Sequence, residues 1–107
     1  MSKYLKDREH TIQFDGDTVR ARVKPLEYGD LLAVKELDSE IEIAKWAIPV
    51  LPKYITLAGL TDAEGAAITI EEVVRVAYFL PLLLELVECL IDSVKPENPP
   101  LPSAPSQ

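Results

Sequence analysis

The sequence predicts an α+β domain, in which an N-terminal β-hairpin packs against three to four helices and the last helix is long and apolar. Three observations lead to this prediction. Apolar and polar residues alternate on both sides of an Asp-Gly pair at residues 15–16, as in a hairpin. Apolar residues then recur at helical spacing over residues 31–48. The longest apolar-periodic run, residues 69–94, opens with the capping-box pattern Thr69-x-x-Glu72.

Length and composition divide the chain into three parts. Its 107 residues suffice for one domain with a modest core. We expect a flexible N-terminus over residues 1–9, a single α+β domain over residues 10–94, and a disordered Pro-rich tail over residues 95–107. The tail includes Pro99-x-x-Pro102, a polyproline-recognition spacing, so docking of the tail to a partner stays open.

The predicted hairpin has one apolar face and one basic face. Its inward positions are apolar on both strands: Ile12, Phe14, Val19, Ala21 and Val23. The second strand carries Arg20, Arg22 and Lys24 at the alternate positions. A lone hairpin is marginal in water, so its apolar face must rest on helices.

Short helices are expected between the hairpin and the long apolar run. Residues 28–48 form either one helix or two, and we favour two because Ser39 can cap the second. Pro49 is expected to stop or kink the run, since proline lacks an N–H and disfavours helix at the preceding residue. Residues 52–58 are expected to form a further short helix, which Gly59 ends in a left-handed cap.

Residues 69–94 are predicted to form one long helix, which Pro81 either kinks or splits. Its polar residues fall on one side, which covers roughly 140° of the circumference. The remaining apolar arc is wider than a small domain needs to bury. We therefore expect a partner-binding face, although the domain wrapping the helix completely is the plain alternative. The candidate residues are Val76, Phe79, Leu80, Leu83, Leu84, Val87 and, elsewhere in the chain, Trp46.

Composition argues against several classes of function. The formal net charge of −7 disfavours binding to nucleic acid or to an anionic membrane surface. Charged residues interrupt the most apolar stretch, so a membrane span is not expected. The single cysteine, Cys89, forms neither an internal disulfide nor a cysteine-based zinc site. A reduced thiol indicates a cytoplasmic setting.

The chain is not expected to be an enzyme. Its single histidine, His10, lies at the edge of a predicted strand, and no Ser or Cys has an identifiable base partner. No phosphate-binding loop, metal motif or nucleophile elbow is present in the sequence. We therefore predict no catalytic residues, no cofactor and no metal site.

Two short segments resemble motifs of the tail assembly chaperones of long-tailed bacteriophages. Residues 24–32, KPLEYGDLL, resemble the family's "R/K-P-L-x-x-G-D" turn and leucine-rich helix, and residues 59–65, GLTDAEG, resemble its "G-L-x-D-x-x-G" turn. Glu27 stands where the family usually has Thr or Ser, so the helix cap must differ. The resemblance covers about residues 10–94.

The resemblance implies a non-catalytic protein of the host cell cytoplasm, absent from the mature virion. It would bind tape-measure and/or tail-tube protein during virion morphogenesis, and a homo-oligomer is among its expected states. Some members are also made as a longer frameshifted product, and residues 95–107 would suit a linker to such an extension. The alternative is a structural or oligomeric adaptor protein that stays in a phage particle or another assembly and uses the same apolar helix face.

Overall fold

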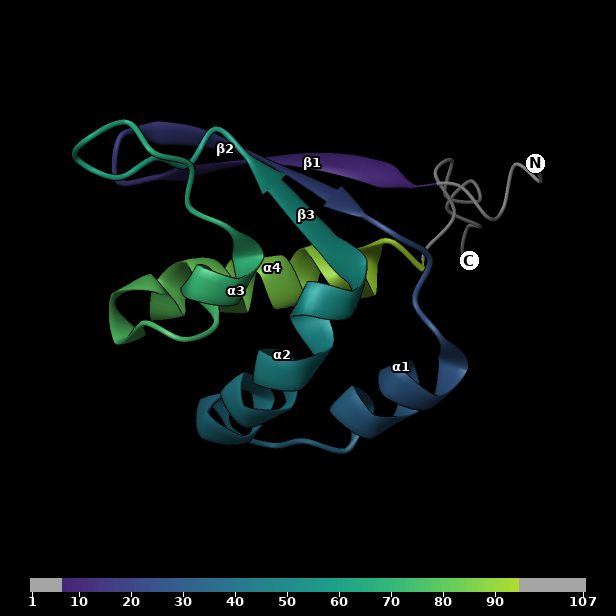
Figure 1. Cartoon of the computed structure of the whole chain (residues 1–107). Coiled ribbons are helices and arrows are strands. Elements are labelled where there is room, and N and C mark those ends of the chain that lie inside the picture. Colours follow the sequence, from purple (N-terminus) through teal and green to yellow (C-terminus); the bar gives the residue numbers. More distant parts are fainter. Residues whose placement is uncertain (1–6, 95–107) are drawn as a thin grey trace, which may run out of the picture.

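The computed structural model describes residues 7–94, which form a three-stranded antiparallel sheet with helices on one face (Figure 1). The predicted α+β class is confirmed. The predicted disordered tail, and all but the last three residues of the predicted flexible N-terminus, lie outside the described residues. The elements are β1 (Arg8–Phe14), β2 (Asp17–Val23), α1 (Tyr28–Lys35), α2 (Glu40–Tyr54), β3 (Ile55–Ala58), α3 (Ile70–Val73), the 3-10 helix η1 (Ala77–Phe79) and α4 (Leu80–Asp92).

The N-terminal hairpin forms as predicted, with β1 beginning at Arg8 inside the segment expected to be flexible. Phe14 pairs with Asp17 across a two-residue turn, whose residues Asp15 and Gly16 have φ values of 52° and 86°. Two left-handed residues match the twist of the flanking strands. Along β2 the apolar residues Val19, Ala21 and Val23 are buried, as the alternation predicts.

The break between α1 and α2 falls at Ser39, as expected. The Ser39 hydroxyl accepts a hydrogen bond from the backbone N–H of Glu42 at 3.2 Å. The Glu42 carboxylate accepts one from the N–H of Asp38 at 3.1 Å. Together these bonds satisfy two backbone donors around the start of α2; they resemble a capping box, except that the second donor is Asp38 and not the cap residue Ser39.

Of the two outcomes expected at Pro49, a stop or a kink, the stop is wrong. α2 continues through Pro49 and Pro52 to Tyr54. Each proline removes one backbone hydrogen bond, but burial of the neighbouring Val50 and Leu51 holds the segment helical. Packing against the rest of the core therefore outweighs the local cost of the two prolines.

The predicted short helix over residues 52–58 is also wrong, because its second half is strand β3. Ile55 pairs with Val23, so the end of α2 leads directly into the sheet. Gly59 has the positive φ expected of it, 91°, but it follows a strand and does not cap a helix. A Cβ at Gly59 would clash with the backbone carbonyl oxygen of Thr18, so this position requires glycine.

A continuous helix over residues 69–94 does not form, and the split that was allowed for at Pro81 falls before it, at Val76. α3 has only four residues, and Val76 is extended with φ −106° and ψ 124°. Thr69 stands at the start of α3 but its side chain makes no capping hydrogen bond. Pro81 lies in the first turn of α4, where its missing N–H costs no helical hydrogen bond. The chain thus reverses between α3 and α4 (Figure 1).

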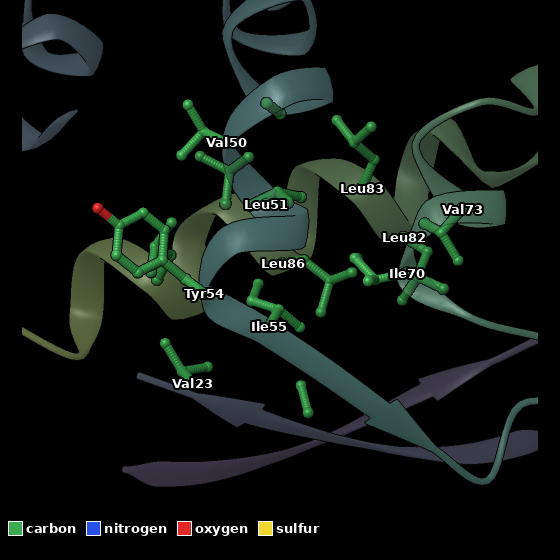
Figure 2. Packing of buried hydrophobic residues seen from close by; sticks show 14 of the residues in the cluster. Val23, Val50, Leu51, Tyr54, Ile55, Ile70, Val73, Leu82, Leu83 and Leu86 are labelled. Atoms are coloured by element: carbon green, nitrogen blue, oxygen red, sulfur yellow. The ribbon is translucent and has the colours of Figure 1, made fainter. Parts of the chain in front are cut away.

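The core lies between the sheet and the helices, and Figure 2 shows how its side chains converge. Leu51 of α2 lies near Leu86 of α4 and Ile55 of β3, whereas the Tyr54 ring points to the left in Figure 2, away from these two residues. α3 adds Ile70 and Val73, which are buried. Because the chain reverses, α3 and α4 can both place apolar residues in the core. This explains why two short helices form in place of one long helix. No helix within residues 7–94 is long and apolar enough to cross a bilayer.

Candidate protein-binding surface

The segment where the chain reverses carries a group of exposed apolar side chains. Val76 is 42% exposed, Tyr78 is 64% exposed and Leu80 is 43% exposed. We call these three residues the junction patch. They span the segment from the end of α3 to the first residue of α4, at one end of the helical layer (Figure 1).

Aromatic contacts hold the junction patch against the tip of the hairpin. The ring of Phe14 on β1 lies 6.1 Å from that of Tyr78 and 5.8 Å from that of Phe79, centroid to centroid. The Tyr78 hydroxyl donates a hydrogen bond to the Asp15 carboxylate at 2.8 Å. This bond and the negative charge of Asp15 raise the pKa of Tyr78. The patch is therefore positioned by residues more than sixty positions earlier in the chain.

A second exposed apolar row lies on α2, which packs against both α3 and α4. Ile41 is 69% exposed and Ile48 is 49% exposed. The two are seven residues apart, so they lie on the same side of the helix. We call them the α2 row. Tyr28 and Leu32, one turn apart on α1, are also exposed.

The structure divides the residues predicted to bind a partner. Val76 and Leu80 belong to the junction patch, whereas Phe79 and Leu84 are half-buried. Leu83 is 4% exposed and Val87 is 3% exposed, so both belong to the core of the domain. A partner reaches these two residues only if the core opens. Their prediction as contact residues assumed a continuous helix, which the structure replaces with two.

Trp46 lies apart from the other predicted residues. It is half-buried, and seven residues separate it from Lys53, which forms an ion pair with Asp30 of α1. Trp46 therefore lies on the side of α2 that faces α1, away from the α2 row. Its indole nitrogen is buried without a hydrogen-bond partner among the described residues. Trp46 packs with the core and adds nothing to the junction patch.

Sequence reasoning missed Tyr78, Ile41 and Ile48 as exposed apolar residues. Tyr78 fell on the polar side of the expected long helix, and the two isoleucines matched the spacing of a buried face. Ile41 stands between Glu40 and Glu42, and this flanking charge is a signal of exposure. No comparable signal marks Tyr78, because its exposure depends on the reversal at Val76.

A hydrogen-bond network fixes α1 onto the end of α2. The Tyr54 hydroxyl donates to the Asp30 carboxylate at 2.5 Å and accepts from the backbone N–H of Glu27 at 3.3 Å. Lys53 donates to the same carboxylate at 3.1 Å. The bonds from Tyr54 and Lys53 lower the pKa of Asp30. Burial and the bond to Asp30 raise the pKa of Tyr54 to about 12. Asp30 is the last residue of the "P-L-x-x-G-D" match, so that motif gains a structural role here.

The remaining polar groups give little sign of a chemical site. Burial and the nearby carboxylates raise the pKa of Cys89 to about 11, which keeps the thiol protonated at neutral pH. The Asp62 carboxylate accepts hydrogen bonds from the N–H groups of Glu64 and Ala66, both at 2.9 Å, and so closes its own turn. Within residues 7–94 no three His, Cys, Asp or Glu residues gather as metal ligands would.

An open groove of about 210 Å³ runs between β3 and the start of α3. Its lining is Pro52, Ile55, Thr56, Leu57, Thr69, Ile70 and Glu71.

No protein-family model, curated protein or solved structure matches the chain. The exposed apolar residues of the helical layer are therefore judged on their own geometry.

Proposed function

We propose that this protein is a non-catalytic tail assembly chaperone, which binds tape-measure and/or tail-tube protein during phage tail morphogenesis. The observation that carries this proposal is the junction patch. Three large side chains, at alternate positions 76, 78 and 80, are exposed on a segment that aromatic contacts hold in place. Side chains fixed in advance lose little conformational freedom when a partner covers them, which favours binding.

The partner best suited to this surface is an amphipathic helix. The junction patch and the α2 row both belong to the helical layer, and neither is covered within the described residues. An apolar helix face can lie on such residues through anchors spaced three, four or seven positions apart. Glu40 and Glu42 beside Ile41 keep the free protein soluble while the row stays exposed. A tape-measure protein, expected to be long and largely helical, supplies such a partner.

The resemblance at residues 24–32 and 59–65 supports the same proposal. In the first segment Asp30 joins α1 to α2, and in the second Gly59 approaches the backbone of β2 closely. Both motifs therefore fall at positions that fix the relative placement of helices and sheet. That role is consistent with a shared fold that carries a variable binding surface.

The experiment is co-expression with the tape-measure and tail-tube proteins encoded beside this chain, followed by affinity capture. We expect the double variant Val76→Asp/Leu80→Asp to lower the affinity for the client at least tenfold, because two carboxylates would be desolvated at the contact. Leu32→Asp, an equally exposed position on α1, serves as the matched control and should bind normally. Unchanged far-UV circular dichroism would show that the variants fold. Equal capture by the double variant and the wild type would contradict the proposal.

A second candidate is a structural or oligomeric adaptor that remains in a finished assembly. The exposed Tyr28 and Leu32 on α1 favour it, because they offer a second apolar surface away from the junction patch. Mass spectrometry of purified mature particles separates the two candidates. Stoichiometric amounts of the chain would support the adaptor, and its absence from particles would support the chaperone.

A further inference from the structure

Within residues 7–94, the outer edge of strand β1 pairs with no other strand and lacks several of the features that protect sheet edges. β1 has seven residues and pairs one-to-one with β2 over its whole length, so no bulge twists the edge away. Its sequence, REHTIQF, carries charged side chains only at its start, Arg8 and Glu9, and contains no proline, glycine or lysine. Natural proteins commonly blunt exposed edges by such means or by shortening the strand. An edge left regular and complete is suited to receive another strand.

The opposite edge of the sheet is different. β3 has only four residues, and the start of α3 lies beside it across the groove that Thr69 and Ile70 line. A further strand cannot approach β3 without displacing that segment. An additional strand can therefore pair with the described sheet only at the edge formed by β1.

The turn determines which backbone groups of β1 point outward. In a hairpin with a two-residue turn, Phe14 and Asp17 form a hydrogen-bonded pair, and such pairs alternate along the strands. By this alternation, the backbone groups of residues 18, 20, 22 and 24 face away from β1. The hydrogen bond from the Lys24 N–H to the Tyr54 carbonyl, on that side of β2, agrees with this. The N–H and C=O groups of Glu9, Thr11 and Gln13 consequently face away from β2.

These three residues are self-complementary about Thr11. If a second copy of β1 pairs antiparallel with the first, Thr11 faces its own counterpart and Glu9 faces Gln13 of the other copy. The pairing forms about six backbone hydrogen bonds, because each outward residue exchanges two with its partner. It also opposes Thr with Thr and Glu with Gln on the outer face, so no like charges meet directly. We propose that two copies of this chain associate through β1, centred on Thr11, to form a continuous six-stranded sheet.

The chain's own C-terminal segment is a poor occupant of this edge. Residues 95–107 contain five of the nine prolines, and proline cannot donate to a strand ladder. The proposed pairing uses backbone groups of β1 and none of the residues of the junction patch or the α2 row. It therefore does not depend on the proposed chaperone function, and either can fail alone.

The dimer should be weak and dependent on salt. Edge pairing buries little surface compared with a standard interface, so association in the micromolar range is expected. The net charge of −7 on each chain opposes association. Raising the salt concentration from about 0.05 M to about 0.5 M should therefore strengthen the dimer by screening. Sedimentation equilibrium of the full chain measures the dissociation constant under both conditions.

Two edge variants test the contact. Thr11→Pro removes the central outward N–H, which the monomer does not use, and should weaken the dimer at least tenfold. Thr11→Val retains that N–H and the preference for a strand, and should dimerise as the wild type does. Equal dimerisation of the proline variant and the wild type would overturn the proposal.

Cysteine cross-linking tests the register and remains decisive if Thr11→Pro unfolds the chain. In a Cys89→Ser background, Thr11→Cys places two thiols across the two-fold axis with Cα atoms about 5.5 Å apart, within disulfide range. Gln13→Cys places them about 14 Å apart, so oxidation should give dimers only with Thr11→Cys. A mixture of Glu9→Cys and Gln13→Cys should cross-link as well. A monomeric mass up to about 1 mM protein, or equal cross-linking at positions 11 and 13, would refute pairing through β1.

Discussion

Tyr54 joins three segments of the chain through one hydroxyl group. Tyr54 is the last residue of α2. Its hydroxyl donates a hydrogen bond to Asp30 in α1 and accepts one from the backbone N–H of Glu27, just before α1. Its ring is buried in the core. In α1 only Val34 is buried, with Leu31 half-buried against the core, so this polar contact adds to a small apolar attachment of α1.

Replacing Tyr54 with Phe tests this attachment. The ring remains, but the Asp30 carboxylate and the Glu27 N–H both lose a partner, so the free energy of unfolding should fall by about 1–2 kcal/mol. Urea denaturation measures the change. Tyr28→Phe is the control: it also removes a tyrosine hydroxyl, but from an exposed side chain, and should leave the free energy of unfolding unchanged. Equal stability of the Tyr54 and Tyr28 variants would show that the network adds nothing.

The same network predicts how stability changes with pH. The folded state lowers the pKa of Asp30, so its contribution is present above the unfolded pKa of about 3.9 and is lost as pH falls through the folded value. The folded state raises the pKa of Tyr54 to about 12, so that contribution is present below pH 10.0 and is lost between pH 10.0 and about 12.

Asp30→Asn should mainly reduce the acid dependence and Tyr54→Phe the alkaline one. Denaturation curves across the acid and alkaline ranges measure them separately. We expect Asp30→Asn to flatten the acid limb and also to reduce the loss above pH 10.0, because Asp30 helps to raise the pKa of Tyr54. Tyr54→Phe should remove the loss above pH 10.0 and weaken the acid limb, which the bond from Lys53 to Asp30 still supports. An unchanged acid limb in Asp30→Asn would mean that other carboxylates govern the acid response.

At the scale of the elements, the connection from β3 to the next segment depends on close backbone approach. Gly59 follows β3 with φ 91°, and a side chain there would meet the Thr18 carbonyl in β2. Gly65 has a similar φ of 84°, but nothing lies near the position of its Cβ. A side chain at Gly65 would therefore face only an unfavourable backbone conformation, whereas one at Gly59 would face that conformation and a steric clash.

Alanine substitution at both glycines provides a matched comparison. Gly65→Ala should cost about 1 kcal/mol, since only the left-handed backbone is strained. Gly59→Ala should cost about 2 kcal/mol more, because the strand backbone must also move. Thermal unfolding of the two variants measures the difference. Similar costs at both positions would show that the sheet relaxes freely around residue 59.

At the scale of the whole molecule, the reversal between α3 and α4 separates core residues from surface residues. Leu82, Leu83 and Leu86 are buried, while Val76 and Leu80 are exposed. These residues belong to one continuous apolar stretch of sequence. The domain therefore covers most of that stretch itself and leaves its first part uncovered, which makes the junction patch a far smaller surface than a whole helix face.

Leu83→Asp should accordingly unfold the domain. A carboxylate at this buried position lacks a partner in the core, at a cost of several kcal/mol out of the roughly 5–15 kcal/mol typical of a domain. Leu80→Asp, in the exposed patch, should cost about 1 kcal/mol or less. Circular dichroism and thermal unfolding distinguish the two. A folded Leu83→Asp variant would mean that the core opens easily at α4.

Some features were determined by the sequence alone. The hairpin follows from alternation around Asp15 and Gly16, and the start of α2 follows from the cap at Ser39. These signals are local: each depends on residues within a few positions of one another, so neighbouring residues suffice to specify them. The exposed position of Val76 was also expected, although for a helix that does not form.

Only the tertiary structure decided the remaining features. α2 passes through Pro49 and Pro52 because distant residues bury its apolar face, and residues 55–58 become a strand because β2 offers an edge to pair with. The break at Val76 arises in the same way, since α3 and α4 both reach the core only if the chain turns back. Burial and strand pairing between segments far apart in the sequence outweighed the local preferences of the residues concerned.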